Sequence, residues 1–294
     1  MSVPAAYLGI ILIWTTTPLA IKWSNDSSDF LLAVSARMSV GFVICLLLLW
    51  LMRIPLRWHR EAVMTYLAAG MGVFAAMISV YWGAQYIPSG LISVLYGLSP
   101  MVMGLFAALW LGERFFTTAK LGGLLLALAG LTVIFLPQGE LGAVSARGLA
   151  GVLLSVLFHS LGAVWVKRLG TQMHPLAINC GALSLAVPLY IVSWLLFGDA
   201  VPTSLPDHSV GAILYLAIFG TVIGFNLYFY VLKRVSAAVV GVITLITPVL
   251  ALLLGQGLNG ETIASHVWYG TAGILLGLTL FMWGGRLRRL LVRV

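Results

Sequence analysis

The chain has 294 residues, of which 61% are hydrophobic and only 8% are charged, and its formal net charge is +8. Soluble domains contain roughly 45–50% apolar and 25% charged residues, so this composition excludes a protein that covers a water-facing surface with charge. The apolar residues form continuous runs of about 20 rather than alternating with polar ones, which predicts an all-α integral membrane protein and not a barrel.

The sequence predicts ten membrane-spanning helices joined by short connections. Each is long enough to cross about 30 Å of hydrocarbon at about 1.5 Å per residue. The first span has no charged leader and no small-residue cleavage site, so we expect it to be a retained helix. The predicted spans are 4–22, 30–51, 63–84, 89–111, 119–136, 148–166, 175–196, 209–231, 238–258 and 265–284.

The positions of the basic residues predict the orientation of the chain. If the N-terminus is cytoplasmic, only Lys22, Arg37 and Arg147 of the sixteen Lys and Arg residues fall toward the outer side. Short cytoplasmic loops are enriched in Lys and Arg, so we expect a multi-pass protein of the cell inner membrane with both termini cytoplasmic. The positive charge then reflects topology and contact with anionic lipid, and not nucleic acid, for which the loops are too short.

Polar side chains in the first three spans are candidates for an internal cavity. Trp14 and Thr17 belong to a polar stretch, WTTTP, in the first span, and Tyr81 lies in the third. Arg37 lies about two turns into the second span, where a charge costs roughly 2.5–3.5 kcal/mol on insertion scales. For Arg37 we expect a structural ion pair or a cap on backbone carbonyls rather than contact with substrate.

The fourth and ninth spans carry matching stripes of small and polar residues at helical spacing. Such stripes suit either close helix packing or a water-filled cavity, and we expect Tyr96 and Thr244 to face a cavity. Pro100 and Pro248 lie on the same stripes. Each removes a backbone hydrogen bond and predicts a kink, which is either fixed or works as a hinge.

Glu113 and Glu261 each follow a glycine at the end of a predicted span. We expect them to stabilise the positive N-terminal end of the helix that comes next, with closure of a gate as the alternative.

His159 is the only histidine deep inside a predicted span. Ionisable groups at that depth are costly and usually face the protein interior. The imidazole could relay protons, could bind a substrate group or a neighbouring hydroxyl, or could be satisfied in packing. Asn226, in the eighth span, is a further candidate for the cavity.

The second half of the chain repeats the first in inverted orientation. The matching residues lie five spans apart, and an odd number of spans reverses direction in the bilayer. The sequence therefore predicts two inverted five-helix repeats, residues 1–138 and 146–294, as in transporters that open to each side in turn. At a constant offset of 148 residues, the matched pairs are Pro100 and Pro248, Gly112 and Gly260, Glu113 and Glu261, and Gly122 and Gly270.

Several segments resemble the EamA branch of the drug/metabolite transporter superfamily: ARMSVGF, SPMVMGLFAALWLGER and LGGLLLALAGLTVI, with TPVLALLLGQGLNGE and YGTAGILLGLTLF in the second copy. The resemblance covers essentially the whole chain. It implies a central cavity between the halves, lined mainly by spans 1, 3, 4, 6, 8 and 9. Members export amino acids and other metabolites, and eukaryotic relatives exchange nucleotide sugars or phosphorylated compounds. The second copy departs from the pattern, because NGETI replaces LGERF and the basic neighbour of the glutamate is missing.

These features favour an alternating-access exporter of a small amphipathic metabolite, with an amino acid or a derivative as the preferred class. Aromatic and hydroxyl side chains with a histidine and no mid-span carboxylate suit a zwitterion better than a bare cation. The alternative is efflux of drugs or toxic apolar compounds.

We expect neither an enzyme nor a cofactor or metal site, because catalytic groups do not cluster and no Walker motif is present. The expected partners are a small-molecule substrate and the lipid bilayer, and the sequence does not specify an oligomeric state.

Overall fold

The computed structural model describes residues 2–26, 29–112, 117–135, 142–202, 204–234 and 243–291. Eight helical segments in this part of the chain are long and apolar enough to cross a membrane. Two shorter apolar helices, Thr118–Ile134 and Ile246–Asn259, account for the fifth and ninth predicted spans. The protein is therefore an all-α, multi-pass membrane protein with ten spans, as the sequence predicts.

Two of the spans are divided. The fourth consists of α4 and α5, and the eighth of α9, the π-helix η1 and α10. The first half of the chain contains α1 (Val3–Asn25), α2 (Phe30–Leu51), α3 (Arg60–Ala84), α4 (Ser89–Tyr96), α5 (Ser99–Leu111) and α6 (Thr118–Phe135). The second half contains α7 (Gly142–Leu169), α8 (Pro175–Phe197), α9 (Asp207–Tyr215), η1 (Leu216–Gly224), α10 (Phe225–Leu232), α12 (Ile243–Asn259) and α13 (Ser265–Leu291).

Local sequence signals set where helices begin and end. The Asp29 carboxylate accepts a hydrogen bond from the Leu31 amide at 3.2 Å, and His174 Nδ1 accepts one from the Leu176 amide at 3.2 Å. Both side chains satisfy amides that the first helical turn leaves unpaired. At the other end, Gly112 follows α5 with φ of 67° and Gly260 follows α12 with φ of 62°. Only glycine adopts this left-handed conformation freely, so this matched pair ends equivalent spans of the two halves in the same way.

The two matched prolines have different structural effects. Pro100 lies in the first turn of α5, after a break at Gly97 and Leu98 that separates α4 from α5. Pro248 lies inside α12, which continues as a helix on both sides of it. The two equivalent spans therefore differ: the fourth is interrupted just before its proline, whereas the ninth stays helical on both sides of Pro248.

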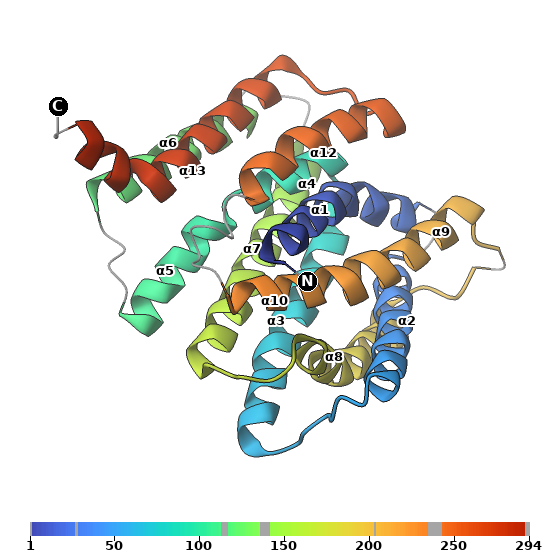
Figure 1. The fold of residues 1–294 in the computed structure, drawn as a ribbon. Helices are drawn as coiled ribbons and strands as arrows, with labels where there is room; N and C mark the ends of the chain where they lie inside the picture. The colour runs from blue at the N-terminus through green and yellow to red at the C-terminus, as the bar shows by residue number, and fades with distance from the viewer. Residues whose placement is uncertain are drawn as a thin grey trace.

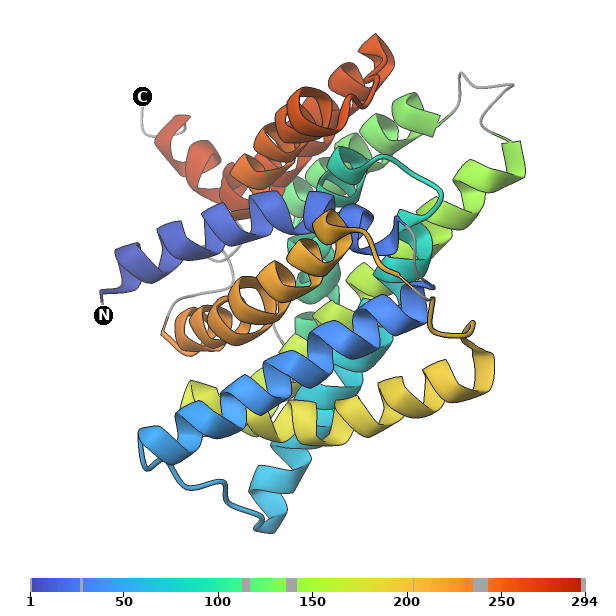
Figure 2. The same cartoon turned by 90° about the vertical axis from the view of Figure 1, so that its right-hand side faces the viewer.

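The two halves pack through pairs of helices, one from each half. α3 lies against α7, α2 against α8, and α6 against α13, and Figures 1 and 2 both show α6 and α13 side by side. α1 packs against the eighth span, which consists of α9, η1 and α10. In the repeat, α1 corresponds to α7 and the eighth span corresponds to α3, so this contact is the counterpart of the one between α7 and α3. This exchange relation is the structural counterpart of the inverted sequence repeat.

Glycines allow the paired helices to approach closely. A Cβ atom at Gly72 of α3 would lie 2.8 Å from Gly162 Cα, and one at Gly162 of α7 would lie 2.9 Å from Gly72 Cα. Close backbone contact through small residues is the usual way in which helices pack in lipid, where apolar side chains gain little by leaving the hydrocarbon. These tight pairs fix the frame around the space between the halves.

Candidate functional site

A cavity of about 100 Å³ lies between the two halves. Both halves contribute to its wall, and Arg37 adds the second span to those that the family resemblance implies. The residues that line it are Trp14, Thr17, Pro18, Ile21, Arg37, Met77, Val80, Ile92, Ser93, Tyr96, Ser99, Pro100, Met103, His159, Gly220, Phe225, Tyr228 and Thr247.

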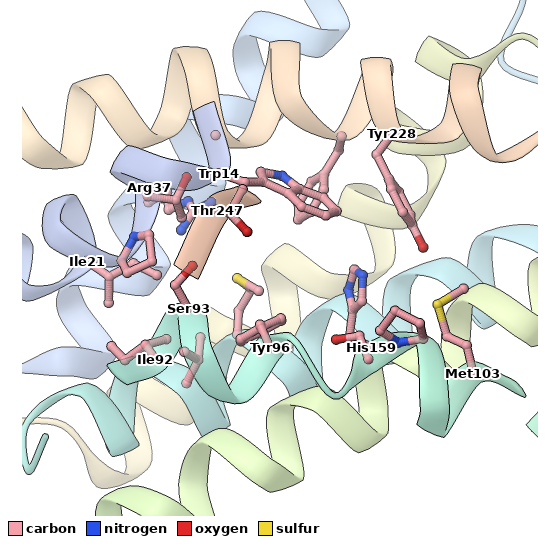
Figure 3. A pocket seen from close by; sticks show the side chains of 18 residues that line it. Trp14, Ile21, Arg37, Ile92, Ser93, Tyr96, Met103, His159, Tyr228 and Thr247 are labelled. Atoms are coloured by element: carbon pink, nitrogen blue, oxygen red, sulfur yellow. The ribbon is translucent and has the colours of Figure 1, made fainter. Parts of the chain in front are cut away.

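Four aromatic rings form the middle of the wall. The Tyr228 ring centroid lies 5.4 Å from that of Trp14 and 5.3 Å from that of His159. His159 also makes edge contacts with Trp14 and Tyr96, each at 6.2 Å between centroids. Figure 3 shows Trp14 and Tyr228 on one side of the cavity, with Tyr96 and His159 opposite. The four rings contact one another and together give this stretch of the wall an aromatic surface that a ligand in the cavity can contact.

The polar atoms of these rings differ in their partners. The Tyr96 hydroxyl lies 2.5 Å from Ser155 Oγ, which donates to the Ala76 carbonyl at 2.6 Å. The Tyr228 hydroxyl is buried and has no hydrogen-bond partner among the described residues. His159 contacts the surrounding rings and is half-buried. The wall therefore combines one satisfied hydroxyl with polar groups that a ligand could engage.

Arg37 lies at the end of the cavity that Ser93 and Thr247 also line (Figure 3). Its side chain is 2% exposed. Arg37 Nε donates to Thr221 Oγ1 at 3.0 Å, and Nη1 donates to the Tyr81 hydroxyl at 3.3 Å. The expected ion pair or carbonyl cap is therefore replaced by two hydroxyl partners, and the guanidinium lies on the cavity wall.

A polar network joins the halves beyond this end. Glu261 Oε1 accepts from the Ser89 amide at 3.0 Å, and Oε2 accepts from the Gly90 amide at 3.5 Å, at the start of α4. Asn259 Nδ2 donates to Glu261 at 3.0 Å, and Trp23 Nε1 donates to Asn259 Oδ1 at 2.8 Å. Glu261 thus caps α4 of the opposite half rather than the following helix, α13. The network holds α1, α4 and α12 together.

The structure brings together Trp14, Thr17, Tyr96 and His159 on the cavity wall. The Thr17 hydroxyl donates to the Ile13 carbonyl of its own helix at 2.7 Å.

The expectations for Tyr81 and Asn226 are corrected. Tyr81 is buried behind the wall and contributes by holding Arg37. Asn226 Nδ2 donates to the Val222 carbonyl one turn back at 2.6 Å, and Asn226 is not among the residues that line the cavity. The Thr244 side chain and Glu113 lie outside the described residues.

Sequence reasoning did not select Met77, Met103, Tyr228 or Thr247, which also line the cavity. Three of them are apolar or aromatic residues in spans rich in such side chains, so composition does not distinguish them from lipid-facing ones. Thr247 lies directly before Pro248 and three residues after Thr244, both of which belong to the polar stripe of the ninth span. This position was the one sequence signal that could have identified it.

Comparison with known proteins agrees with this architecture. Residues 3–136 and 146–283 each match the EamA-like transporter family. The inner membrane transporter YedA of Escherichia coli K12 is 29% identical over 289 residues, covering 95% of this chain and 90% of YedA. A transporter of Archaeoglobus fulgidus is 26% identical and covers 91% of this chain and 94% of its own.

A solved crystal structure has the same fold, with a TM-score of 0.69 at 20% sequence identity, over 95% of this chain and 96% of the other. Because both halves of the sequence match the family and the cavity lies between them, the chain belongs to the EamA-like transporter family.

Proposed function

We propose that this transporter is an alternating-access exporter of a small amphipathic metabolite, with an amino acid or a derivative as the preferred substrate class. The observation that carries the proposal is the cavity between the halves, which joins a cluster of four rings to a buried cationic side chain. The rings suit the apolar part of a substrate and the cationic end suits its polar part.

The composition of the wall supports a zwitterion or an anion over a bare cation. Among the residues that the structure describes, no Asp or Glu lines the cavity. Its volume of about 100 Å³ is small beside the roughly 300–1,000 Å³ of sites that take drug-sized ligands. The lack of acidic side chains disfavours a bare cation, and the small volume favours a compact metabolite.

The packing around the cavity supports alternating access. α4 lies against α1 and α12 at the Glu261 end, whereas α5 lies apart from α12 in Figure 1. A transporter that opens to one side at a time needs this kind of asymmetry between its two ends. With both termini cytoplasmic, as the basic loops predict, the Glu261 end faces the exterior, and release of substrate requires that end to open.

One observation favours the alternative of drug efflux. The four-ring cluster could accept planar apolar compounds without reading their polar groups, and such a transporter would discriminate little between enantiomers.

A counterflow screen in proteoliposomes tests the proposal. Vesicles are preloaded with one compound, and uptake of the same labelled compound is followed, using individual amino acids, both enantiomers of the aromatic ones, and several lipophilic drugs. We expect saturable and stereoselective exchange of one amino-acid class. Movement of drugs without stereoselectivity would replace the metabolite assignment with efflux. Protein-free vesicles and vesicles with heat-denatured protein provide the background.

A further inference from the structure

We infer that Arg37 binds the carboxylate of the transported molecule, and that this carboxylate, rather than an amino group, is the polar group that the cavity requires. The inference rests on the proposed function, because it assumes that the cavity is the transport site. According to this inference, Arg37 makes the transporter select molecules that have a carboxylate over those whose only charged group is an amine.

The first argument is the hydrogen bonding of the guanidinium. An arginine side chain has five N–H donors. Thr221 and Tyr81 accept from two of them, which leaves three without an acceptor among the described residues. An unpaired charged donor in the interior of a membrane protein is costly. We therefore expect a group of the bound substrate to accept hydrogen bonds from the remaining donors of Arg37.

The second argument is that the surroundings hold the guanidinium in place. Thr221 is fully buried, and its carbonyl accepts from Asn179 Nδ2 at 2.9 Å, which fixes the π-helix η1 at this point. The preceding residue is Gly220, where a Cβ atom would lie 2.8 Å from Arg37 Nη2. The missing side chain leaves room for the guanidinium, and π-helical turns of this kind are frequent at functional sites. The group is therefore positioned before a ligand arrives.

The third argument is charge. In the part of the chain that the structure describes, the one ion pair joins Asp26 to His208, so Arg37 has no carboxylate partner there. The cavity wall, which also lacks Asp and Glu among the described residues, has a net positive charge at this end. A carboxylate fits the planar guanidinium through two parallel hydrogen bonds, which is the geometry that arginine recognises best.

The consequence is a ranking of analogues that share one apolar body. We expect L-phenylalanine and 3-phenylpropanoate to bind, because both have a carboxylate for Arg37 and a ring for the aromatic cluster. We expect 2-phenylethylamine to bind at least tenfold more weakly, since no acidic side chain of the described wall pairs with its ammonium group. The trio of L-leucine, 4-methylpentanoate and 3-methylbutylamine applies the same test to a smaller body.

The experiment measures how each probe stabilises the purified wild-type protein against heat, and how each inhibits counterflow of the best substrate in proteoliposomes. Binding of the amines as tight as that of the carboxylates, or failure of every carboxylate to bind, would overturn the inference. This comparison needs no mutation.

Variants then connect the ranking to Arg37. Arg37→Gln is expected to weaken binding of the carboxylates about 10- to 100-fold. The three probes of each trio should then bind with similar affinities. Arg37→Lys keeps the charge but not the two parallel donors, so it should show an intermediate loss. Gly220→Ala keeps the arginine but displaces its Nη2, and should weaken the carboxylates selectively.

Ser35→Ala is the matched control. Ser35 lies on the same helix, α2, and donates to the Tyr190 carbonyl at 3.1 Å, away from the cavity wall. Its removal should leave the ranking unchanged. If Arg37→Gln weakened all probes equally and kept their order, the arginine would be structural and the inference would fail.

The two proposals fail in different ways. If carboxylates bind through Arg37 but no amino acid exchanges, the Arg37 site stands and the amino-acid assignment falls. If amino acids exchange and Arg37→Gln leaves their affinities unchanged, the exporter assignment stands and the carboxylate site is refuted.

Discussion

Individual residues on the cavity wall keep polar atoms that the fold itself does not satisfy. The Tyr228 hydroxyl and Ser99 Oγ are buried without a hydrogen-bond partner among the described residues. Both residues line the cavity. Burying an unpaired polar group costs about 1–3 kcal/mol, so a sequence selected for stability alone would have phenylalanine and alanine at these positions. We therefore expect a bound substrate to form hydrogen bonds with these two hydroxyls.

Tyr228→Phe and Tyr190→Phe form a matched pair that tests this point. Both tyrosines are buried, but the Tyr190 hydroxyl donates to the Val73 carbonyl at 2.9 Å, away from the cavity wall. We expect Tyr190→Phe to lower the free energy of unfolding by about 0.5–1.5 kcal/mol. Tyr228→Phe should leave that free energy unchanged or raise it by about 1 kcal/mol, while it slows counterflow. Unfolding in mixed micelles and counterflow at equal protein content measure both effects. Equal destabilisation by the two variants would show that Tyr228 has a hidden structural partner.

At the scale of helical elements, the sequence predicted where spans occur but not how they are interrupted. The predicted span 30–51 coincides with α2, because a long apolar run between Asp29 and a polar turn leaves little choice of ends. Pro100 signalled a disturbance of the fourth span but not a complete break between α4 and α5, and the π-helix η1 has no sequence signal. A π-helix changes which residues share a face, so the ordinary helical period did not show that Tyr228, and not Asn226, lines the cavity. The contact of Arg37 with Thr221 was not predicted for a related reason: Thr221 and its neighbour Gly220 lie in the other half of the chain.

The cap that Glu261 places on α4 is the element-scale contact with the clearest expected effect on conformation. Hydrogen bonds to a charged acceptor contribute about 1.5–3 kcal/mol, and here they join the N-terminus of α4 in the first half to the residue Glu261 that follows α12 in the second. We expect Glu261→Ala to favour opening of this end, which should expose Ser89, now 1% exposed. In a Ser89→Cys background, labelling by a membrane-impermeant maleimide should speed up about tenfold.

Glu61→Ala is the control for that experiment, because Glu61 is exposed in the first turn of α3 at the opposite end of the bundle. It removes the same charge and should leave the labelling rate unchanged. Identical rates in the two variants would mean that the Glu261 cap does not hold this end closed.

At the scale of the whole molecule, the two halves meet through reciprocal glycine contacts in two helix pairs, α3 with α7 and α6 with α13. A Cβ atom at Gly130 of α6 would lie 2.6 Å from the Gly270 carbonyl oxygen, and one at Gly270 of α13 would lie 2.5 Å from the Gly130 carbonyl oxygen. Gly72 and Gly162 make the same kind of exchange between α3 and α7. Each half therefore presents surfaces that only the other half fills.

We therefore expect the repeats to assemble when they are made as separate chains, residues 1–138 and 146–294. Neither chain alone should support counterflow, because the cavity wall takes residues from both. Co-expression should restore exchange, and the two chains should purify together through a tag on one of them. Gly72→Leu should prevent this assembly, because its side chain would force apart the backbones of α3 and α7, and overpacking of this kind costs about 1–3 kcal/mol. Gly211, which has no atom within 4 Å of an added Cβ, supplies the control Gly211→Leu, which should assemble normally. Exchange by one half alone would show that the half forms a complete transporter with a second copy of itself, and would remove the need for the inverted partner.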